Sequence, residues 1–478
     1  MNALRVAAAA LVALAAGCAG LPAKHEPVHL IDSAPLEGFE PTGGGDWPAP
    51  EWWKRYQDPT LDHLIELGGA HSPSLATAHA RYDSARQSVR LAAAQSGAHL
   101  EASADADRQR LSDNGVFPPR LLGFTWYNQF DLGLQASYTF DWWGKQRSAV
   151  EAAMDQAHAA QADRSAAALL LASSIADTYF GWQSDQNRLS LAREKEAAVV
   201  SHAKITDARV RADLDSADEL NHSDLAQAAA RAQIAALEGS ATLRVVALAA
   251  LVGRSAADLP PLSPRPLPSF PTALPDSVKI DLIARRADIT ASRWRVESAE
   301  RSLASARADF FPDVTVNALL GLSSLDVGKL LEYGSRVPQA SAAIHLPIFD
   351  AGRLKARYGG AQAAIDAAVS SYQDTVIGAA RDVATQAATL AQIDAQRAQR
   401  LKQVEAALRL KDTAAARVRQ GLSDSRGELT ATQSWIDQRD NLMQLDSAAL
   451  SADIALQRAL GGGYEQKLAR SSSTTATP

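Results

Sequence analysis

Cysteine and aromatic residues are scarce in this chain, and positive charge is not in excess. Cys18 is the only cysteine among 478 residues, which excludes a disulfide framework or a cysteine-rich metal site. Aromatic residues make up 6% of the chain, and the net charge is −6, so no global basic field points to nucleic acid. No uninterrupted apolar run reaches 18 residues, and we therefore predict no transmembrane helix.

Sequence motifs of catalysis are absent as well. The chain contains no Walker A loop, no Gly-x-Ser-x-Gly and no His-Glu-x-x-His. His25 and His29 are four residues apart, but Pro27 lies between them, so they do not form the helical pair that a metal site would use. We predict that the chain is not an enzyme and binds no metal or cofactor.

Alanine is abundant instead, and 46% of the residues are hydrophobic while 21% are charged. A composition built on alanine, leucine, glutamine, arginine and acidic residues favours helices and excludes wholesale disorder.

The N-terminus has the pattern of an export signal. Arg5 precedes an apolar run at 6–16, which is too short to span a bilayer but suits the core of a secretory signal. The run ends in Gly17-Cys18, and small residues before a cysteine resemble a bacterial lipobox. This resemblance implies a signal peptide at 1–17 and a lipid on Cys18, and the abundance of proline and glycine after it predicts an extended leader at 18–60. A plain signal peptide, with Cys18 incidental, is the alternative.

A repeat with an offset of about 208 residues organises the remainder. Gly144-Lys145-Gln146-Arg147 recurs as Gly352-Arg353-Leu354-Lys355, and Arg209-Val210-Arg211 recurs as Arg417-Val418-Arg419. The two halves are separated by a stretch with seven prolines, which cannot be regular helix. The predicted segments are a first repeat at 61–259, a linker at 260–275, a second repeat at 276–463 and a flexible tail at 464–478.

Each repeat shows the same order of elements. A moderate helix comes first, at 60–97 and 276–309, then a β-like zone, then a very long helical zone without proline. The helix predicted from Gly144 to Arg211 would be near 100 Å long at about 1.5 Å per residue. Such a rod is too long to fold back on an ordinary globular core.

The β-like zones alternate between apolar and polar residues over about ten positions, which is the length of transmembrane barrel strands. Soluble hairpins with one face on a core would give the same pattern. The four predicted strands lie at 98–110, 128–141, 312–323 and 337–349. Four strands cannot close a barrel, since about eight is the practical minimum, and open sheet edges are not tolerated in lipid. Several chains would therefore have to share one barrel.

Several segments resemble the outer-membrane factor (TolC-like) family of tripartite efflux pumps, in particular its NodT-type lipoproteins. The segment from Leu346 to Leu354, Leu-Pro-Ile-Phe-Asp-Ala-Gly-Arg-Leu, is the most specific of them. The other carriers are Asp58-Pro59-Thr60-Leu61, Phe140-Asp141-Trp142-Trp143-Gly144-Lys145, Arg286-Ala287-Asp288-Ile289, Ala308-Asp309-Phe310-Phe311-Pro312 and Ala459-Leu460-Gly461-Gly462-Gly463.

The resemblance implies a mainly α fold with a transmembrane β part. Three chains would form one 12-stranded outer-membrane β-barrel, four strands from each, continued by a long periplasmic α-helical barrel. The implied partners are two further copies, a periplasmic adaptor (membrane-fusion) protein, an inner-membrane pump of the RND or major-facilitator type, and outer-membrane lipid. The implied location is the outer membrane of a Gram-negative bacterium, with a lipid anchor and an extension into the periplasm.

The helix tips are the candidate site, because in relatives this turn touches the adaptor and closes the pore. In the first tip Asp213 stands where the family has glycine, and in the second Gly427 and Thr430 stand where relatives carry gate aspartates. We expect Arg426 to pair with Asp213 or Glu219, and Asp424 and Glu428 to share a helix face if the helix has begun at Asp424. Solvated, charged helix ends are the competing interpretation. The candidate gate and adaptor residues are Asp213, Asp218, Glu219, Gly421, Leu422, Asp424, Arg426 and Glu428.

The leading hypothesis is a passive trimeric exit duct for small toxic compounds or drugs. Its nearest rival is a type I secretion duct for proteins. A structural coiled-coil lipoprotein without a pore is a further alternative, which explains the helices and Cys18 but not the strands. A soluble periplasmic adaptor is less consistent with the sequence, which has no lipoyl-like, β-rich block.

Overall fold

A computed structural model describes residues 28–35, 45–114, 118–269, 275 and 278–465 of the chain. The predicted signal peptide, Cys18 and most of the predicted tail lie outside these residues. The described chain forms two compact units. The first contains Asp83–Ala159 and Arg293–Ser371, and the second contains Leu30–Tyr82, Ala160–Ser292 and the residues from Tyr372 onward.

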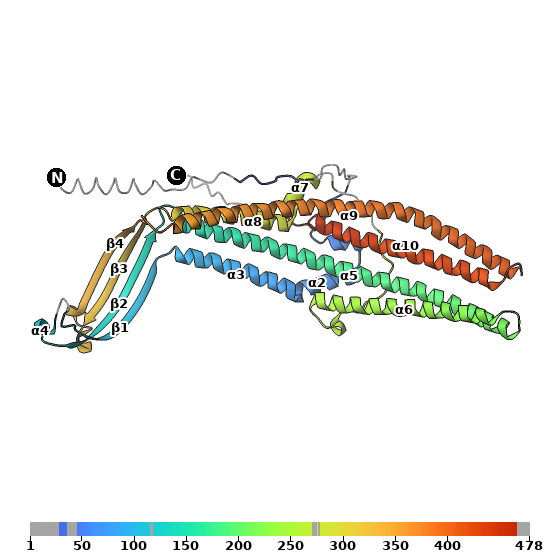
Figure 1. Ribbon diagram of the computed structural model, residues 1–478, viewed down its shortest axis with the longest axis horizontal. Coiled ribbons are helices and arrows are strands. Elements are labelled where there is room, and N and C mark those ends of the chain that lie inside the picture. The colour runs from blue at the N-terminus through green and yellow to red at the C-terminus, as the bar shows by residue number, and fades with distance from the viewer. Residues whose placement is uncertain (1–27, 36–44, 115–117, 270–274, 276–277, 466–478) are drawn as a thin grey trace. The chain divides into compact units, whose positions relative to one another are not determined.

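The first unit contains a four-stranded antiparallel sheet in the order β1-β2-β3-β4 (Figure 1). Its strands are β1 (His99–Arg110), β2 (Trp126–Phe140), β3 (Asp313–Ser324) and β4 (Arg336–His345). The four predicted strands are confirmed, with β2 starting two residues early. The predicted fourth strand ends at His345 instead of 349, because its partner β3 begins at Asp313, which pairs with His345.

The register separates the sheet into an apolar and a polar face. Leu100 pairs with Ala136, Ala136 with Ala318 and Ala318 with Ala340, so the even-numbered residues of all four strands share one face. The even face is apolar over most of its length, and its exposed residues include Leu320 and Ile344. The odd face is polar and carries Glu101, Asp105, Asp107 and Asp131 but no lysine or arginine.

Short helices lie in the loops at one end of the sheet, and long helices start at the other end. The β1–β2 loop contains α4 (Pro119–Leu122), and the β3–β4 loop contains η4 (Val327–Lys329) and η5 (Tyr333–Ser335). At the helix end, the Asp309 side chain is 5% exposed and binds Lys145 Nζ at 2.9 Å and Arg357 Nη1 at 2.6 Å. This buried carboxylate follows directly after α8 (Ala287–Ala308) and binds the starts of α5 (Lys145–Arg211) and α9 (Arg353–Arg419).

The helices are α2 (Pro59–His71), α3 (Pro73–Gln95), α5 (Lys145–Arg211), α6 (Ala217–Val252), α7 (Val278–Arg285), α8 (Ala287–Ala308), α9 (Arg353–Arg419) and α10 (Ser425–Ala459), with η2 (Trp52–Tyr56) and η3 (Ala256–Asp258). Helices α5 and α9 have 67 residues each, and α9 begins and ends 208 residues after α5, which confirms the repeat offset.

Two expected helices are each broken in two. The first breaks at Ser72, whose ψ of 124° is extended, because the ring of Pro73 disfavours helix in the residue before it. The second breaks at Arg286, whose Nη1 donates to the carbonyl of Ala459 at 2.9 Å. The predicted extended leader is also wrong in its last part, since η2 lies within it.

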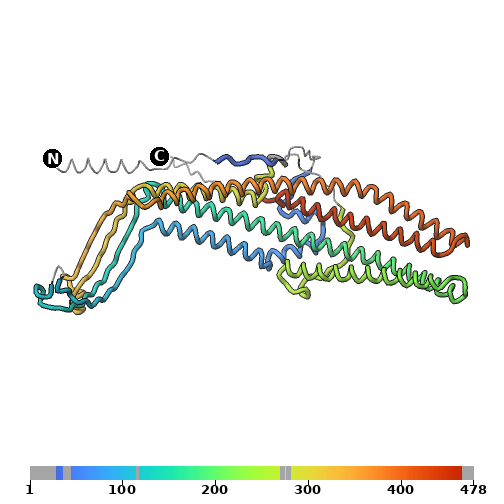
Figure 2. The backbone as a smooth tube through the Cα atoms, viewed as in Figure 1, coloured from blue at the N-terminus to red at the C-terminus, as the bar shows by residue number. Residues whose placement is uncertain are grey.

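In the second unit, α5 and α6 lie side by side as one hairpin, and α9 and α10 form another (Figure 2). Arg244 Nε donates to Asp185 at 2.7 Å in the first hairpin, and Arg397 Nε donates to Asp446 at 2.6 Å in the second. Arg188 joins the two hairpins through Asp440 at 2.7 Å. By length and composition alone α6 could cross a membrane, although the sequence predicted no transmembrane helix. It packs on α5, where Arg244 donates to Asp185.

The core of the second unit joins η2, α2, α5, α6 and α10. Its largest fully buried members include Leu61, Tyr179, Leu248 and Leu450. Asp453 of α10 is also buried, 1% exposed, and accepts a hydrogen bond of 2.6 Å from the hydroxyl of Tyr56. A leader residue therefore donates to a carboxylate in the core.

Asp453→Asn is expected to gain stability relative to the wild type as pH rises. Burial raises the pKa of Asp453, against the opposing charge of Arg55. Because the pKa of Asp453 is higher in the folded state, folding is favoured most at a pH below the ordinary carboxyl pKa near 3.8, where the group is protonated in both states. The folded state loses stability as the pH rises through the raised pKa, because the buried carboxyl must then ionise. Asparagine keeps an acceptor for Tyr56 without that cost. Melting temperatures at acidic, neutral and alkaline pH test this, and a difference independent of pH would contradict it.

Candidate functional site at the helix tips

The two hairpins of the second unit end in tips of the same construction. Helix α5 ends with a hydrogen bond from Leu214 N to the carbonyl of Arg209, and α9 ends with the same bond from Leu422 N to Arg417, both 2.9 Å. Asp213 has φ 56° and Gly421 has φ 69°, the left-handed conformation that ends many helices. Aspartate tolerates this conformation better than most residues, which is why it replaces glycine in the first tip.

The tips differ in their side-chain contacts. In the first tip Arg209 Nε donates to Asp215 at 2.6 Å, which closes the loop on itself and lowers the pKa of Asp215. The matching positions in the second tip are Arg417 and Ser423, which cannot form such a pair. Instead, Asp424 caps α10 by accepting from the backbone N–H groups of Arg426 and Gly427. Helix α10 thus begins at Ser425, so the condition on which Asp424 and Glu428 would share a helix face, a helix already begun at Asp424, is not met.

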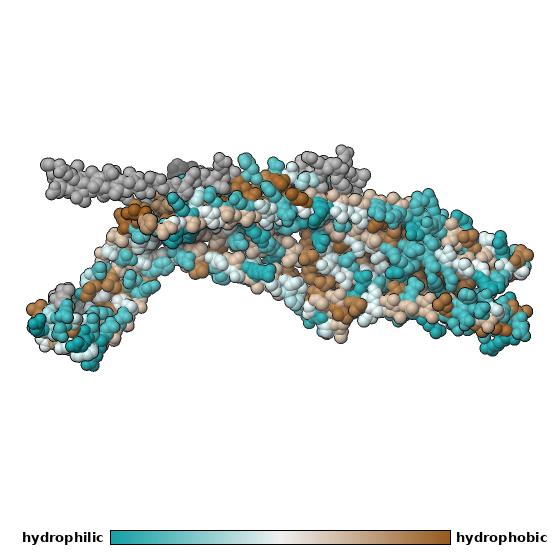
Figure 3. All heavy atoms as spheres, in the orientation of Figure 1, coloured by the Kyte–Doolittle hydropathy of each residue, from teal (hydrophilic) through white to brown (hydrophobic). Residues whose placement is uncertain are grey.

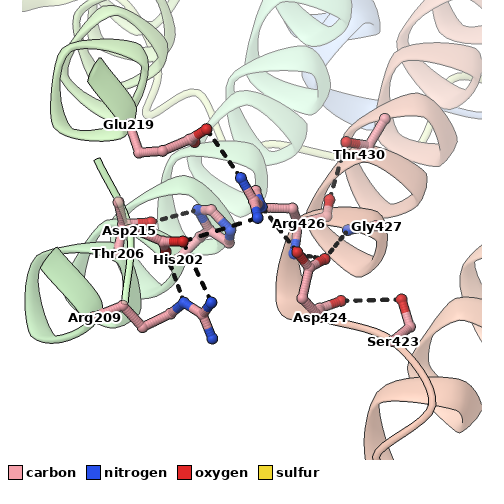
Figure 4. Close-up of polar contacts among 10 residues, drawn as sticks. All are labelled: His202, Thr206, Arg209, Asp215, Glu219, Ser423, Asp424, Arg426, Gly427 and Thr430. Atoms are coloured by element: carbon pink, nitrogen blue, oxygen red, sulfur yellow. Dashed lines mark hydrogen bonds and ion pairs between the residues drawn. The ribbon is translucent and has the colours of Figure 1, made fainter. Parts of the chain in front are cut away.

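Arg426 connects the two tips (Figure 4). Its Nη1 donates to Glu219 at 2.9 Å, its Nη2 lies 3.9 Å from Asp215, and its Nε donates to Asp424 at 2.8 Å. We call these four residues the tip clasp. The Arg426 guanidinium also lowers the pKa of Asp424, so this carboxylate stays ionised across the physiological range. Arg426 of the second hairpin therefore binds carboxylates of both hairpins.

The other candidate residues lie around the tip clasp. The predicted contact of Arg426 with Glu219 is present, whereas Asp213 and Asp218 are exposed and make no ion pair within the described residues. Leu422 is 72% exposed, and its counterpart Leu214 is 64% exposed. Glu428 lines a cavity of about 270 Å³ together with His202. Burial lowers the pKa of His202, which therefore faces the tip clasp as a neutral ring at neutral pH.

Sequence reasoning missed Asp215, Arg209 and His202. Asp215 pairs across six residues within its own loop, outside the helical spacings of three or four. His202 is two turns before the end of α5, and only the packing of α10 brings it near Arg426. The predicted lipid site, Cys18, lies outside the described residues, and its lipidation stays a prediction.

Known proteins are similar to this chain in sequence and in fold. The sequence model of the outer membrane efflux protein family matches residues 64–254 and 280–462. Multidrug resistance outer membrane protein MdtP of Escherichia coli K12 is 32% identical over 451 residues, covering 92% of this chain and 91% of MdtP.

Two solved structures extend the comparison. The outer membrane protein VceC of Vibrio cholerae is 31% identical, with a TM-score of 0.80 over 88% of this chain and all of that one. The outer membrane channel MtrE of Neisseria gonorrhoeae is 26% identical, with a TM-score of 0.80 over 93% of this chain and 98% of that one. The chain belongs to the outer membrane efflux protein family and is an outer-membrane efflux channel.

Proposed function

We propose that three copies of the chain form the passive exit duct of a tripartite efflux system, closed at its periplasmic end by the tip clasp. The clasp carries this proposal, because one arginine holds together the ends of two hairpins that must part for a pore to open. The rest of the duct follows from the sheet and from the exposed tips.

The sheet supports a trimer by strand count. Its outer strands, β1 and β4, each pair on one side only, and four strands are too few to close. Since lipid tolerates no open sheet edge, β4 of one copy would pair with β1 of the next. Three copies give a 12-stranded barrel with the even face toward lipid and the acidic odd face toward the lumen.

The exposed tips support docking of a periplasmic adaptor. Leu214 and Leu422 project at matched places on the two hairpins, and large exposed apolar residues at the end of a protein mark contact sites. An adaptor held there would connect the duct to an inner-membrane pump of the RND or major-facilitator type.

We propose small toxic compounds or drugs as the cargo, because MdtP is named a multidrug resistance protein. A type I secretion duct for proteins is the rival. It would be favoured if loss of this chain stopped export of a protein without changing drug susceptibility.

Replacing Arg426 by alanine is expected to raise the conductance of the purified channel in planar bilayers. Exposed ion pairs contribute only about 0.2–1 kcal/mol each, but each copy loses its contacts to three carboxylates and three copies act on one pore. We expect the open fraction to rise about tenfold, since about 1.4 kcal/mol is a factor of ten.

Arg419→Ala is the matched control for this variant. Arg419 is an exposed arginine at the end of α9, close to the same tip in sequence, and it forms no ion pair within the described residues. Its conductance should equal that of the wild type. Equal conductance of Arg426→Ala and Arg419→Ala would contradict closure by the tip clasp.

A further inference from the structure

The apolar face of the sheet ends in arginines at the loop end. Arg108 and Arg110 are even-numbered residues at the end of β1, and Arg336 is the first residue of β4. The register places all three on the same face as Leu100, Leu132 and Leu322. We call Arg108, Arg110 and Arg336 the arginine rim.

The polar residues of the even face are confined to this end. Besides the arginine rim they are Asn128 and Ser324, and both lie next to the loops. At the helix end the even face finishes in aromatic and aliphatic residues, Tyr138, Phe140 and Ile344. Cations therefore border the apolar face on one side only.

The apolar stretch has the height of a membrane. From Phe130 to Phe140, β2 rises by about 33 Å at about 3.3 Å per residue. With the strand tilt of about 40° usual in barrels, this gives a band about 25 Å tall, which is the apolar height of outer-membrane barrels. Arg108 and Arg110 pair with Asn128 and Trp126, beyond Phe130, and so lie at the level of the lipid headgroups, where a charge costs little. Arg336 pairs with Leu322, which pairs with Leu132, so it lies just inside this edge, and its long side chain can extend to the headgroups.

Aromatic rings, and not carboxylates, contact two of the three guanidinium groups. Arg108 lies over the ring of Trp126 at 5.7 Å, and Arg336 lies over the ring of Tyr333 at 4.4 Å. Within the described residues neither forms an ion pair. Arg110 has Asp113 at 3.7 Å, but both side chains are more than half exposed, so this pair is weak. In Figure 3 hydrophobic and hydrophilic residues stand next to each other at the loop end of the sheet.

We propose that the arginine rim binds the phosphate groups of anionic lipids in the leaflet at the loop end of the barrel. The inference rests on the proposed trimer, in which pairing of β4 with the next β1 brings Arg336 toward Arg108 and Arg110 of the neighbouring copy. Guanidinium groups bind phosphate through two parallel hydrogen bonds, and the apolar face directly below accommodates acyl chains. A soluble anion would use the charges but not the apolar face, so the occupant is a phosphorylated lipid.

The experiment titrates the detergent-solubilised protein with lipid A carrying its phosphates and with the same lipid after their removal. Binding is read as adducts in native mass spectrometry. The wild type should bind the phosphorylated lipid at least about tenfold more tightly, because only the phosphate groups can accept charge-assisted hydrogen bonds from the guanidinium groups. The triple variant Arg108→Gln, Arg110→Gln, Arg336→Gln should bind both lipids equally. Excess inorganic phosphate should not displace the lipid.

A matched triple variant in α9 controls for net charge. Arg409→Gln, Arg417→Gln, Arg419→Gln removes the same number of charges far along the sequence from the sheet, and it should retain the wild-type preference. The same spectra give the mass of the assembly, so a protein that is not a trimer would refute the proposed function separately. A trimer whose preference survives in the rim variant, or is absent in the wild type, would overturn the lipid site. Displacement by inorganic phosphate would overturn it in favour of a free anion.

Discussion

Gly461→Ala is expected to abolish assembly of the channel or reduce it to a small fraction of the wild-type amount. Gly461 has φ 91°, and a Cβ placed there would overlap the backbone carbonyl of Arg285. Left-handed backbone costs a residue with a side chain about 1–2 kcal/mol, and an overlap in a packed site costs about 1–3 kcal/mol more. Because the overlap is with backbone, it cannot be relieved by a rotamer change. Heat-resistant oligomer in membranes, measured by gel, reports the outcome.

Gly352→Ala separates the two causes. Gly352 has φ 90°, almost the same conformation, but a Cβ there meets no atom within 4 Å. This variant should suffer only the backbone cost and still assemble. Equal assembly of the two variants would show that the close approach of Gly461 to the Arg285 carbonyl is not required for the fold.

The two glycines that follow Gly461 also lie where a side chain would overlap neighbouring atoms. A Cβ at Gly462 would overlap the side chain of Leu169 in α5, and one at Gly463 would overlap the backbone of Ala49 and Pro50 in the leader. One turn therefore contacts the end of α7, α5 and the leader at once. The sequence shows the three glycines, but it does not show what they touch, since every partner is distant along the chain.

The long helices were predictable because their signals are local. The absence of proline and the repeat offset located α5 and α9 to within a residue or two, and alternation located the four strands. The break at Ser72 also had a local signal, Pro73, which the prediction of one helix over 60–97 overlooked. The break at Arg286 had no proline signal, and its guanidinium binds both Asp288 and the carbonyl of Ala459, which is distant along the chain.

The tip shows the same limit at the level of side chains. The pairing of Arg426 with Glu219 was among the expected contacts because the repeats place the two hairpin ends together. The capping role of Asp424 was not predicted, although aspartate is among the best N-cap residues, because the sequence left the start of this helix open. His202 was missed because only tertiary packing brings it to the tip.

The second large effect is expected from Asp58→Ala, which should cost about 3 kcal/mol or more of unfolding free energy. The carboxylate, buried with 7% exposure, caps α2 by accepting from Thr60 N at 2.9 Å and also accepts from the hydroxyl of Tyr179 at 2.7 Å. Loss of a cap costs about 1 kcal/mol, and a buried hydroxyl without its partner costs about 1–3 kcal/mol. Burial, together with the adjacent Asp58, raises the pKa of Tyr179, so its hydroxyl remains a donor.

The same network fastens the linker between the repeats to α5. Arg265 Nη1 lies 3.4 Å from Asp58, and its backbone N–H donates to Gln183 at 2.7 Å. Gln183 in turn donates to Tyr179 at 2.8 Å, and Asn187 donates to the carbonyl of Arg265 at 2.7 Å. Asp58 thus connects the leader, α5 and the linker that precedes the second repeat. Its loss should therefore reduce the assembled channel as well as the melting temperature.

A double-mutant cycle with Tyr179→Phe tests whether the hydroxyl is the main partner. If it is, the double variant Asp58→Ala, Tyr179→Phe should be less destabilised than the sum of the two single variants by about 1–2 kcal/mol, because each single change removes the same hydrogen bond. Asp58→Asn should lose less than Asp58→Ala, since an amide oxygen can still cap α2 and accept from Tyr179. Additive effects of the two changes, measured by thermal or denaturant unfolding of the purified protein, would show instead that capping of α2 alone accounts for Asp58.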